Sequence, residues 1–432
     1  MKTITLTLLL AFSATLSAQE PWTLERCIRH GLEHNPDIRA QRLEISGRQL
    51  ETTRKTLAHL PVAGISLARD YNWGRSVDMQ ELVIIRNQLT RASGIQLQAS
   101  VALFEGFTRH LNRLAARQSA ETAAIDAEEL ARTLTLDITR AYLQLMLAGQ
   151  ISTCTQENYA TIVRQRDRTA QLVEAGSQPQ SALNEMQAQV ATEKAAMVEA
   201  ACRVRTARLA LMRLLNLPSE EPFAVEGPSG DEQLPAGPPA VSAVRLEDGV
   251  CRDPRIRSAR SAIEEMRYRH AADKGSLLPG LSLAAGYGTY YSSAADGSLR
   301  TQLDENRNPS LSFRLEIPVF HAGDLLIRVK RSRLDLERAR LNAEKMKQQV
   351  EDEIRSTAIE AENCCQKVLS AEETLHAMQD LLAIMEARYN LGAATAVDYI
   401  TARNQHFKAT SDYLQAKWQY LFQLKLLEQY KP

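Results

Sequence analysis

The residues that most often carry enzyme or metal chemistry are scattered along this 432-residue chain. The sequence contains no glycine-rich phosphate loop, no His-Glu-x-x-His motif and no nucleophile elbow. Three of the eight histidines, His30, His34 and His59, fall on one expected N-terminal helix, but no two of them form a convincing pair of metal ligands. We therefore expect no enzyme activity, no catalytic residues, no resident metal and no cofactor. A hydrolase is the enzyme alternative.

The composition argues against nucleic-acid binding. The formal net charge is zero and aromatic residues make up 5% of the chain, whereas a nucleic-acid binder usually carries a basic excess. The cysteines show no metal-ligand spacing, and we interpret most of them as small helix residues, with a disulfide framework as the alternative. They are Cys27, Cys154, Cys202, Cys251, Cys364 and Cys365.

The N-terminal stretch has the pattern of a secretory signal peptide. Lys2 is followed by an apolar run from Ile4 to Leu16 and by small residues that end at Ala18. This pattern predicts a signal peptide over residues 1–18, with a short buried helix as the alternative. No later stretch approaches the ~18 consecutive apolar residues of a spanning helix. We therefore expect an exported chain without a helical membrane span.

The longest regular pattern runs from Val350 to Tyr389. Every residue at alternating steps of four and three is apolar or small, which is typical of the heptad seam of a helix that lies along a partner helix. The same register recurs 216 positions earlier, from Leu134 to Val173, where only Arg166 is out of character. Neither stretch contains proline. The sequence therefore predicts two copies of one very long helix.

The duplication covers nearly all of the chain expected after export. Asn35-Pro36, where a helix irregularity is expected, recurs as Asp253-Pro254, 218 positions on. We expect a first repeat over 19–217, a proline- and glycine-rich connector over 218–241 and a second repeat over 242–432. Each repeat should contain a helix, a strand pair, a long helix and a return helix. The expected bounds are 23–59, 62–73 with 93–104, 107–175 and 180–217, and then 242–277, 280–291 with 309–320, 324–391 and 396–430.

The four strand candidates alternate between apolar and polar residues. One example is Ile95, Leu97 and Ala99, which alternate with Gln96 and Gln98. A water-soluble antiparallel sheet alternates in the same way, but a length of roughly 9–12 residues also suits tilted strands that cross a bilayer. Export favours the membrane, where several copies would have to close the sheet. The aromatic residues near strand ends, where an interfacial girdle would lie, are Trp73, Tyr287, Tyr290 and Tyr291.

Each strand pair is expected to lead into its long helix through a sharp corner. Proline can end a strand, and glycine adopts dihedral angles that other residues avoid. At their far ends the long helices should stop at Gly176 and Gly392, in the C-cap role, before the return helices. The corner residues are Phe104 and Gly106 in the first repeat, and Pro318, Phe320 and Gly323 in the second.

Helices of this length need partners. At ~1.5 Å per residue each would be roughly 100 Å long, and helical stability in proteins comes mostly from packing. Rods packed side by side around a ring would bury both flanks and leave a polar inner face, which makes a tube. The alternative is an exported coiled-coil scaffold without a channel. That alternative leaves the alternating strands and repeated corners unexplained.

Four features of the sequence occur together and in order. They are the doubled Asn/Asp-Pro helix start, the Phe104-Glu105-Gly106 corner, the run Leu214 to Pro218, and Tyr389-x-x-Gly392 followed by Val397-Asp398-Tyr399. In these features the sequence resembles the TolC-like outer-membrane efflux protein family. The resemblance implies a mostly helical homotrimer, with a periplasmic tunnel of tandem-repeat coiled-coil helices and four strands per chain in a shared twelve-stranded transmembrane barrel. It further implies a passive exit duct of an efflux pump or type I secretion system, with outer-membrane lipid, a periplasmic adaptor and an inner-membrane pump or transporter as partners.

The resemblance also implies a gate at the helix tips, built from tyrosine and aspartate residues. Tyr389 and Asp398 match those positions, and three Asp398 carboxylates would ring the pore. The first repeat departs from the pattern, because Val173 and Ala182 stand at the corresponding places and Glu174 and Glu185 are the nearby acids. The alternatives are that Asp398 is a solvated carboxylate near a helix start, and that Tyr389 is simply the last residue of the seam.

Overall fold

The computed structural model describes residues 22–77, 84–218, 223–225 and 246–430, which fall into two compact units. Unit 1 comprises the described parts of residues 1–40, 128–253 and 349–432, and unit 2 comprises those of 41–127 and 254–348. The signal peptide expected over 1–18 lies outside the described residues. So does the connector over 218–241, apart from 218 and 223–225.

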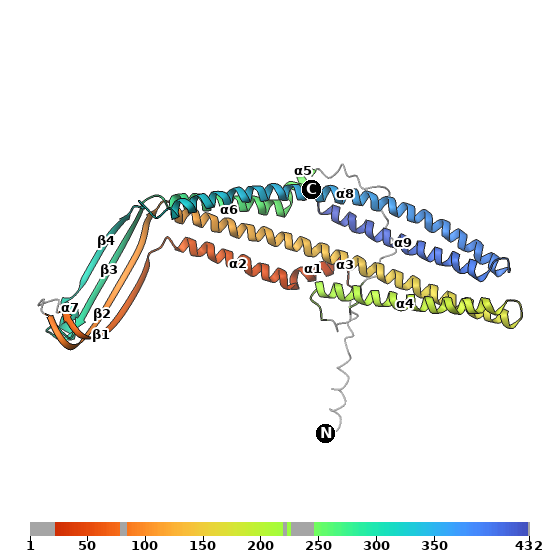
Figure 1. The fold of residues 1–432 in the computed structure, drawn as a ribbon, viewed down its shortest axis with the longest axis horizontal. Helices are drawn as coiled ribbons and strands as arrows, with labels where there is room; N and C mark the ends of the chain where they lie inside the picture. The colour runs from red at the N-terminus through yellow and green to blue at the C-terminus, as the bar shows by residue number, and fades with distance from the viewer. Residues whose placement is uncertain (1–21, 78–83, 219–222, 226–245, 431–432) are drawn as a thin grey trace, which may run out of the picture. The chain divides into compact units, whose positions relative to one another are not determined.

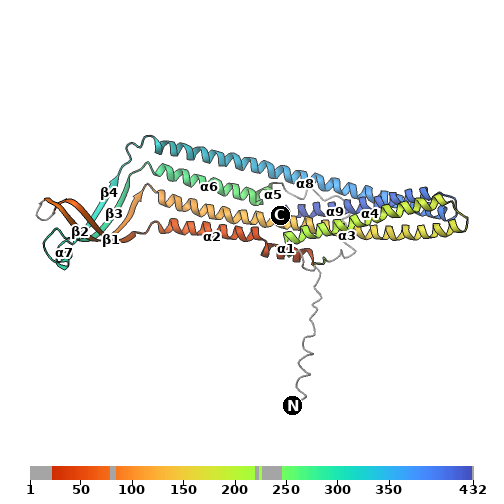
Figure 2. The ribbon, with the colours of Figure 1, turned by 60° about the horizontal axis from the view of Figure 1, so that its bottom comes forward.

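In each repeat one long helix runs alongside shorter helices (Figures 1 and 2). The expected helices over 23–59 and 242–277 are both broken, at Asn35 and at Asp253, because each is followed by a proline that lacks the N–H needed to continue a helix. None of the described helices is long and apolar enough to cross a membrane. The bounds are α1 Leu24–His34, α2 Pro36–Leu57, α3 Thr108–Glu174, α4 Gln180–Leu214, α5 Leu246–Arg252, α6 Pro254–Gly275, α8 Asp324–Asn390 and α9 Ala396–Glu428.

Burial along α3 and α8 follows the heptad pattern. From Leu134 to Val173 and from Val350 to Tyr389, every seam position is buried or half-buried and none is exposed. Ile138 and Val350, for instance, are fully covered. Both helices have 67 residues. All six cysteines are described, and none forms a disulfide.

A buried ion pair helps to fix unit 1 where α5 ends. The guanidinium of Arg132 donates to Asp253 at 2.8 Å, and the carboxylate side chain of Asp253 is fully covered. Arg132 also donates to Gln429 at 3.0 Å and lies over the ring of Tyr430. These contacts join α3 to the chain segments after α5 and α9.

The four strands form one antiparallel sheet in the order β1-β2-β3-β4 (Figure 1). The β1–β2 hairpin is longer than expected, because cross-strand pairing continues past Gly74 although the apolar alternation ends there. In contrast β4 ends at Glu316, not at 320, because Pro318 has no N–H to offer the ladder. The bounds are β1 Val62–Val77, β2 Ile84–Glu105, β3 Gly280–Ser292 and β4 Asn308–Glu316.

The strand registers divide the sheet into two faces. Leu97 lies opposite Ile65 on β1 and opposite Tyr287 on β3, and residues that lie opposite one another share a face. What we call the apolar face carries exposed large side chains: Ile65, Leu67, Trp73, Ile95, Leu97, Leu311, Phe313 and Leu315. The polar face carries small or polar residues: Gly64, Ser66, Gln96, Gln98, Gly286, Ser310, Ser312 and Arg314.

Two details of the sheet differ from the expected alternation. A bulge at Leu103 shifts the β2 register, so that Phe104 and not Leu103 lies opposite Leu281. A short helix, α7 Leu299–Glu305, also lies in the β3–β4 connection and was not expected. It is held by Gln302, which is fully buried and whose amide donates to the carbonyl oxygens of Ser292 and Ala295.

Candidate functional site

The two helix-tip turns have the same backbone structure. Gly176 and Gly392 both have positive φ angles, +72° and +74°. In the first turn the N–H of Ser177 donates to Leu172 at 2.8 Å, and in the second the N–H of Ala393 donates to Arg388 at 2.8 Å. This is the Schellman pattern, in which glycine supplies the left-handed residue. Both tip glycines therefore act as helix C-caps.

Tyr389 is buried beneath the tip of the α8–α9 hairpin. Its side chain is 4% exposed and stacks on Tyr399 with ring centroids 5.3 Å apart. Its hydroxyl lies 3.1 Å from the hydroxyl of Thr169 on α3. Ala182 and Met186 of α4 complete the same cluster. Tyr389 thus packs as the last seam residue and also links α8 to α3.

Asp398 is exposed and forms the capping box at the start of α9 with the N-cap residue Thr395. Its carboxylate accepts from the Thr395 hydroxyl at 2.7 Å and from the Thr395 N–H at 3.1 Å, while its own N–H donates back to the Thr395 hydroxyl. This is a capping box. The hydrogen bonds from Thr395 hold the pKa of Asp398 below its ordinary value of 3.8. The tip therefore presents a fixed negative charge to solvent.

The first repeat has no aspartate at the position equivalent to Asp398, and side-chain packing explains this difference. Ala182, which stands where the second repeat has Asp398, is 8% exposed and packs in the cluster of Tyr389 and Tyr399. A carboxylate at that position would be buried among aromatic rings, which is costly without a partner. The nearby acids Glu174 and Glu185 are both exposed.

A buried polar network crosses the helices above the tip, and no pattern in the sequence predicts it. Asn158 on α3 donates to the Glu193 carboxylate of α4 at 2.8 Å and accepts from Arg403 of α9 at 2.8 Å. Arg403 also donates to the Tyr399 hydroxyl at 3.1 Å. Asn158 and Glu193 are 6% exposed. The amide of Asn158 thus bridges a carboxylate and a guanidinium that lie on different helices.

We expect Asn158→Ala to loosen this part of the helical bundle. The substitution leaves Glu193 and Arg403 without their bridging amide in a buried setting, which costs about 1–3 kcal/mol. Hydrogen exchange of α9 amides should become faster by a corresponding factor. The control is Asn184→Ala on α4, where the amide is exposed and its oxygen accepts a hydrogen bond from Gln180. Equal exchange rates in the two variants would contradict the bridging role.

The strand-to-helix corners both use two consecutive residues with positive φ. These are Gly106 and Phe107 at +57° and +63°, and Ala322 and Gly323 at +49° and +82°. The first corner is tightly packed, because a Cβ on Gly106 would lie 2.0 Å from the carbonyl oxygen of Gly275 at the end of α6. At the second corner Phe320 is 84% exposed, and it follows Pro318, where the chain has left the sheet.

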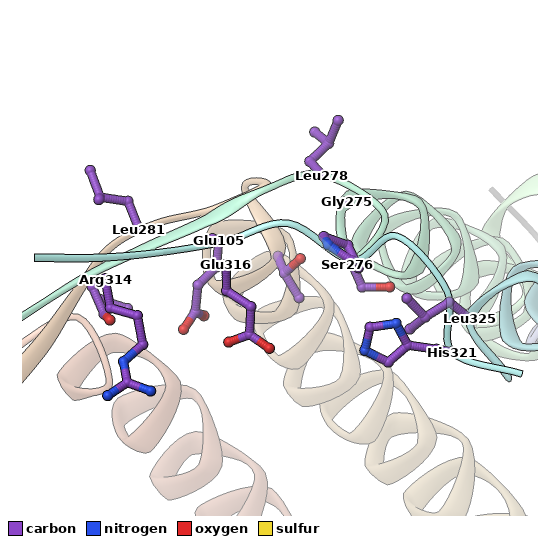
Figure 3. Close-up of a pocket in the computed structure, with 14 residues that line it drawn as sticks. Glu105, Gly275, Ser276, Leu278, Leu281, Arg314, Glu316, His321 and Leu325 are labelled. Carbon is purple, nitrogen blue, oxygen red and sulfur yellow. The ribbon is translucent and has the colours of Figure 1, made fainter.

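A pocket of about 360 Å³ lies beside the corners, on the polar face (Figure 3). Glu105 and Glu316 both flank Gly280 in the strand registers, so their carboxylates project on the same side of the sheet. Figure 3 shows both carboxylates on the strand side of the pocket, with His321 and Ser276 on the helical side. Arg109 pairs with Glu105 at 2.8 Å. No group of three metal-binding side chains occurs among the described residues.

The strand-end aromatic residues do not all share a face. Trp73, Tyr287 and Tyr291 lie on the apolar face. Tyr290 pairs with Gly94 and lies on the polar face, because side chains alternate along β3. A girdle that faces lipid can therefore include only three of the four expected residues.

The fold resembles that of outer-membrane channels. The solved structure of the outer-membrane channel OprN has a TM-score of 0.81 to this chain at 17% identity, with 95% of this chain and 91% of that chain covered. The paired long helices and four-stranded sheet are thus the fold of such channel proteins.

The family model described as outer membrane efflux protein matches residues 28–217 and 246–430. The chain belongs to the outer membrane efflux protein family. Alkaline protease secretion protein AprF of Pseudomonas aeruginosa is 22% identical over 397 residues, which are 90% of this chain and 80% of AprF. Outer membrane protein TolC of Escherichia coli is 25% identical over 300 residues, which are 67% of this chain and 59% of TolC.

Proposed function

We propose that this chain is an outer-membrane channel that forms the passive exit duct of an efflux pump or type I secretion system. Family membership and the fold support this reading over a coiled-coil scaffold. The relatives point the same way, because AprF is a secretion protein and the family is one of efflux proteins. The sheet would cross the outer membrane and the helices would line a periplasmic tunnel.

One observation carries the proposal. The apolar face of the sheet exposes large side chains such as Leu67 and Trp73, at 75% and 77%. Among the described strands, β1 and β4 each pair on one side only. Unpaired edges are a liability in water, whereas a closed barrel has no edges. Three copies would supply twelve strands, close the sheet and turn the apolar faces toward lipid.

Membrane fractionation tests this proposal. The protein should fractionate with the outer membrane and show a heat-sensitive trimer band on gels. A folded monomer that stays soluble in buffer without detergent would instead support the scaffold. Cross-linking and mass spectrometry of the membrane-embedded protein should recover a periplasmic adaptor and an inner-membrane pump or transporter, which are the partners we propose.

We further propose that the helix tips form the gated entrance. In a trimer three exposed Asp398 carboxylates would ring the pore, and Tyr389 would support each tip from beneath through Tyr399 and Thr169. The capping box fixes the position of each carboxylate. A ring of fixed negative charges attracts multivalent cations.

We expect Asp398→Asn to weaken block by multivalent cations in planar bilayers. Because the pKa of Asp398 is lowered, the carboxylate stays ionised as the pH falls toward 3.8, so wild-type block should persist in mild acid. The control is Asp380→Asn, which removes an exposed carboxylate from α8 farther from the turn. Unchanged block in Asp398→Asn would remove Asp398 from the entrance.

A further inference from the structure

The structure points to a specific register for the contact between neighbouring copies of the sheet. We infer that β4 of one copy pairs antiparallel with β1 of the next, with Leu315 opposite Leu67 and Phe313 opposite Arg69, and that Arg314 then forms an ion pair with Asp70 across this contact. We call this β4–β1 contact the subunit strand contact. The inference rests on the proposed trimer and goes beyond it by assigning the residues that meet.

The two hairpins of the chain are structurally equivalent copies. Leu97 lies opposite Ile65 in the first hairpin, and Phe313 lies opposite Leu283 in the second. The same correspondence relates Ala99 and Ala63 to Leu315 and Leu281, and Ile95 and Leu67 to Leu311 and Ala285. The step from Leu97 to Phe313 is 216 positions, the offset of the long helices, and the step from Ile65 to Leu283 is 218 positions, the offset of Asn35-Pro36 to Asp253-Pro254. The repeat offsets therefore match β2 to β4 and β1 to β3 in the same register that the strand pairing shows.

The β2–β3 pairing is therefore an internal copy of the subunit strand contact. It joins the second strand of one hairpin to the first strand of the other, which is what β4 and the next copy's β1 must also do. Ala99 lies opposite Ala285 and Leu97 opposite Tyr287. Transferred by the hairpin correspondence, these pairs become Leu315 with Leu67 and Phe313 with Arg69. Ile95 opposite Thr289 likewise becomes Leu311 with Tyr71.

This register keeps both faces intact. Leu67 and Tyr71 of β1 meet Leu315 and Leu311 on the apolar face, while Asp70 meets Ser312 on the polar face. Arg69 lies on the apolar face by its position along β1, with its guanidinium over the ring of Tyr71. A slip by one residue would place every apolar side chain of β1 on the polar face. The two faces exclude registers in which β1 is shifted against β4 by an odd number of residues. Among the remaining registers, the correspondence between the hairpins selects one.

Charge complementarity supports the same register. Arg314 lies opposite Ala68 and so is the diagonal neighbour of Asp70, at a separation that long side chains span. Both side chains are exposed, and neither has an ion-pair partner among the described residues. At the internal β2–β3 contact the equivalent residues are Gln98 and Gly288, which are uncharged. The charges therefore distinguish the subunit strand contact from the internal β2–β3 pairing.

Cysteine cross-linking in the membrane-embedded protein tests the register. In a background with Cys202→Ser and Cys251→Ser, which removes the exposed cysteines, we expect Leu67→Cys with Leu315→Cys to give disulfide-linked dimers and trimers on oxidation. The matched control, Leu67→Cys with Leu311→Cys, is out of register by four residues, roughly 13 Å. That separation is beyond the reach of a disulfide, and each single variant should not cross-link.

The outcomes separate the register from the proposed function. If the protein forms a heat-sensitive trimer but cross-links through Leu67→Cys with Leu311→Cys, or through neither pair, the register is wrong and the proposed channel is unaffected. Absence of any trimer overturns both. For the ion pair, Arg314→Asp should reduce the trimer fraction several-fold, and adding Asp70→Arg should restore it. Gln98→Asp, at the internal equivalent, should have little effect. Failure of the double variant to recover overturns the ion pair.

Discussion

Arginine in place of Leu97 or Phe313 is expected to prevent accumulation of the protein in the outer membrane. Both residues lie on the apolar face, where they are 44% and 66% exposed, and the proposed trimer would turn them toward lipid. An arginine at the bilayer midplane costs about 2–4 kcal/mol, and each trimer would carry three. The measurement is the amount of heat-sensitive trimer in isolated outer membranes.

The matched control is arginine one residue away. Gln98→Arg places the same side chain on the polar face of the same strand, where water would fill the bore. That variant should assemble at close to the wild-type level. If arginine at Leu97 were tolerated as well as arginine at Gln98, the apolar face would not face lipid and the proposed barrel would be wrong.

Gly106→Ala is expected to disrupt the first strand-to-helix corner. Its φ of +57° costs about 1–2 kcal/mol for a residue with a Cβ. In addition the new Cβ would lie 2.0 Å from the carbonyl oxygen of Gly275 and 2.8 Å from its carbon, so the backbone itself would have to move. Overpacking of this kind costs about a further 1–3 kcal/mol. Denaturant unfolding of the trimer in detergent should show the loss.

The second corner offers the control for Gly106→Ala. Gly323 has a φ of +82°, but the nearest atom to an added Cβ, Cδ1 of Ile327, is 4.0 Å away. Gly323→Ala should therefore show the backbone strain without the clash. Equal loss of stability in the two variants would mean that the contact between Gly106 and Gly275 does not restrict the corner.

Much of the fold could be predicted from the sequence because the duplication is regular. The heptad pattern from Val350 to Tyr389 and its earlier copy indicated the buried side of two helices, since burial on a long helix follows a fixed period. The alternation of Leu97 with Gln98 likewise indicates the two faces of a sheet, although the β1–β2 hairpin extends beyond the alternating residues. Backbone pairing past Gly74 needs no amphipathic pattern, so that part of the strand left no trace in the residue types.

The helix-tip interior could not be predicted in the same way. The network of Asn158, Glu193 and Arg403 depends on which helices become neighbours, and it joins residues as far as 245 positions apart. Polar residues in a helix usually face water, so their types alone gave no reason to bury them. Tyr290 differs from the expected girdle for a simpler reason: nearness to a strand end does not fix the face, which depends on parity along β3.

The burial of Ala182 has a consequence for the symmetry of the entrance. Two hairpins per chain would give a trimer six tips in a ring, and the duplication makes their turns alike at Gly176 and Gly392. Ala182 gives one tip a neutral, covered position where the other carries an anionic cap. Tips with and without the Asp398 carboxylate would then alternate around the pore. Any assembly that contacts all six must bind them in two distinct ways, even when its own subunits are identical.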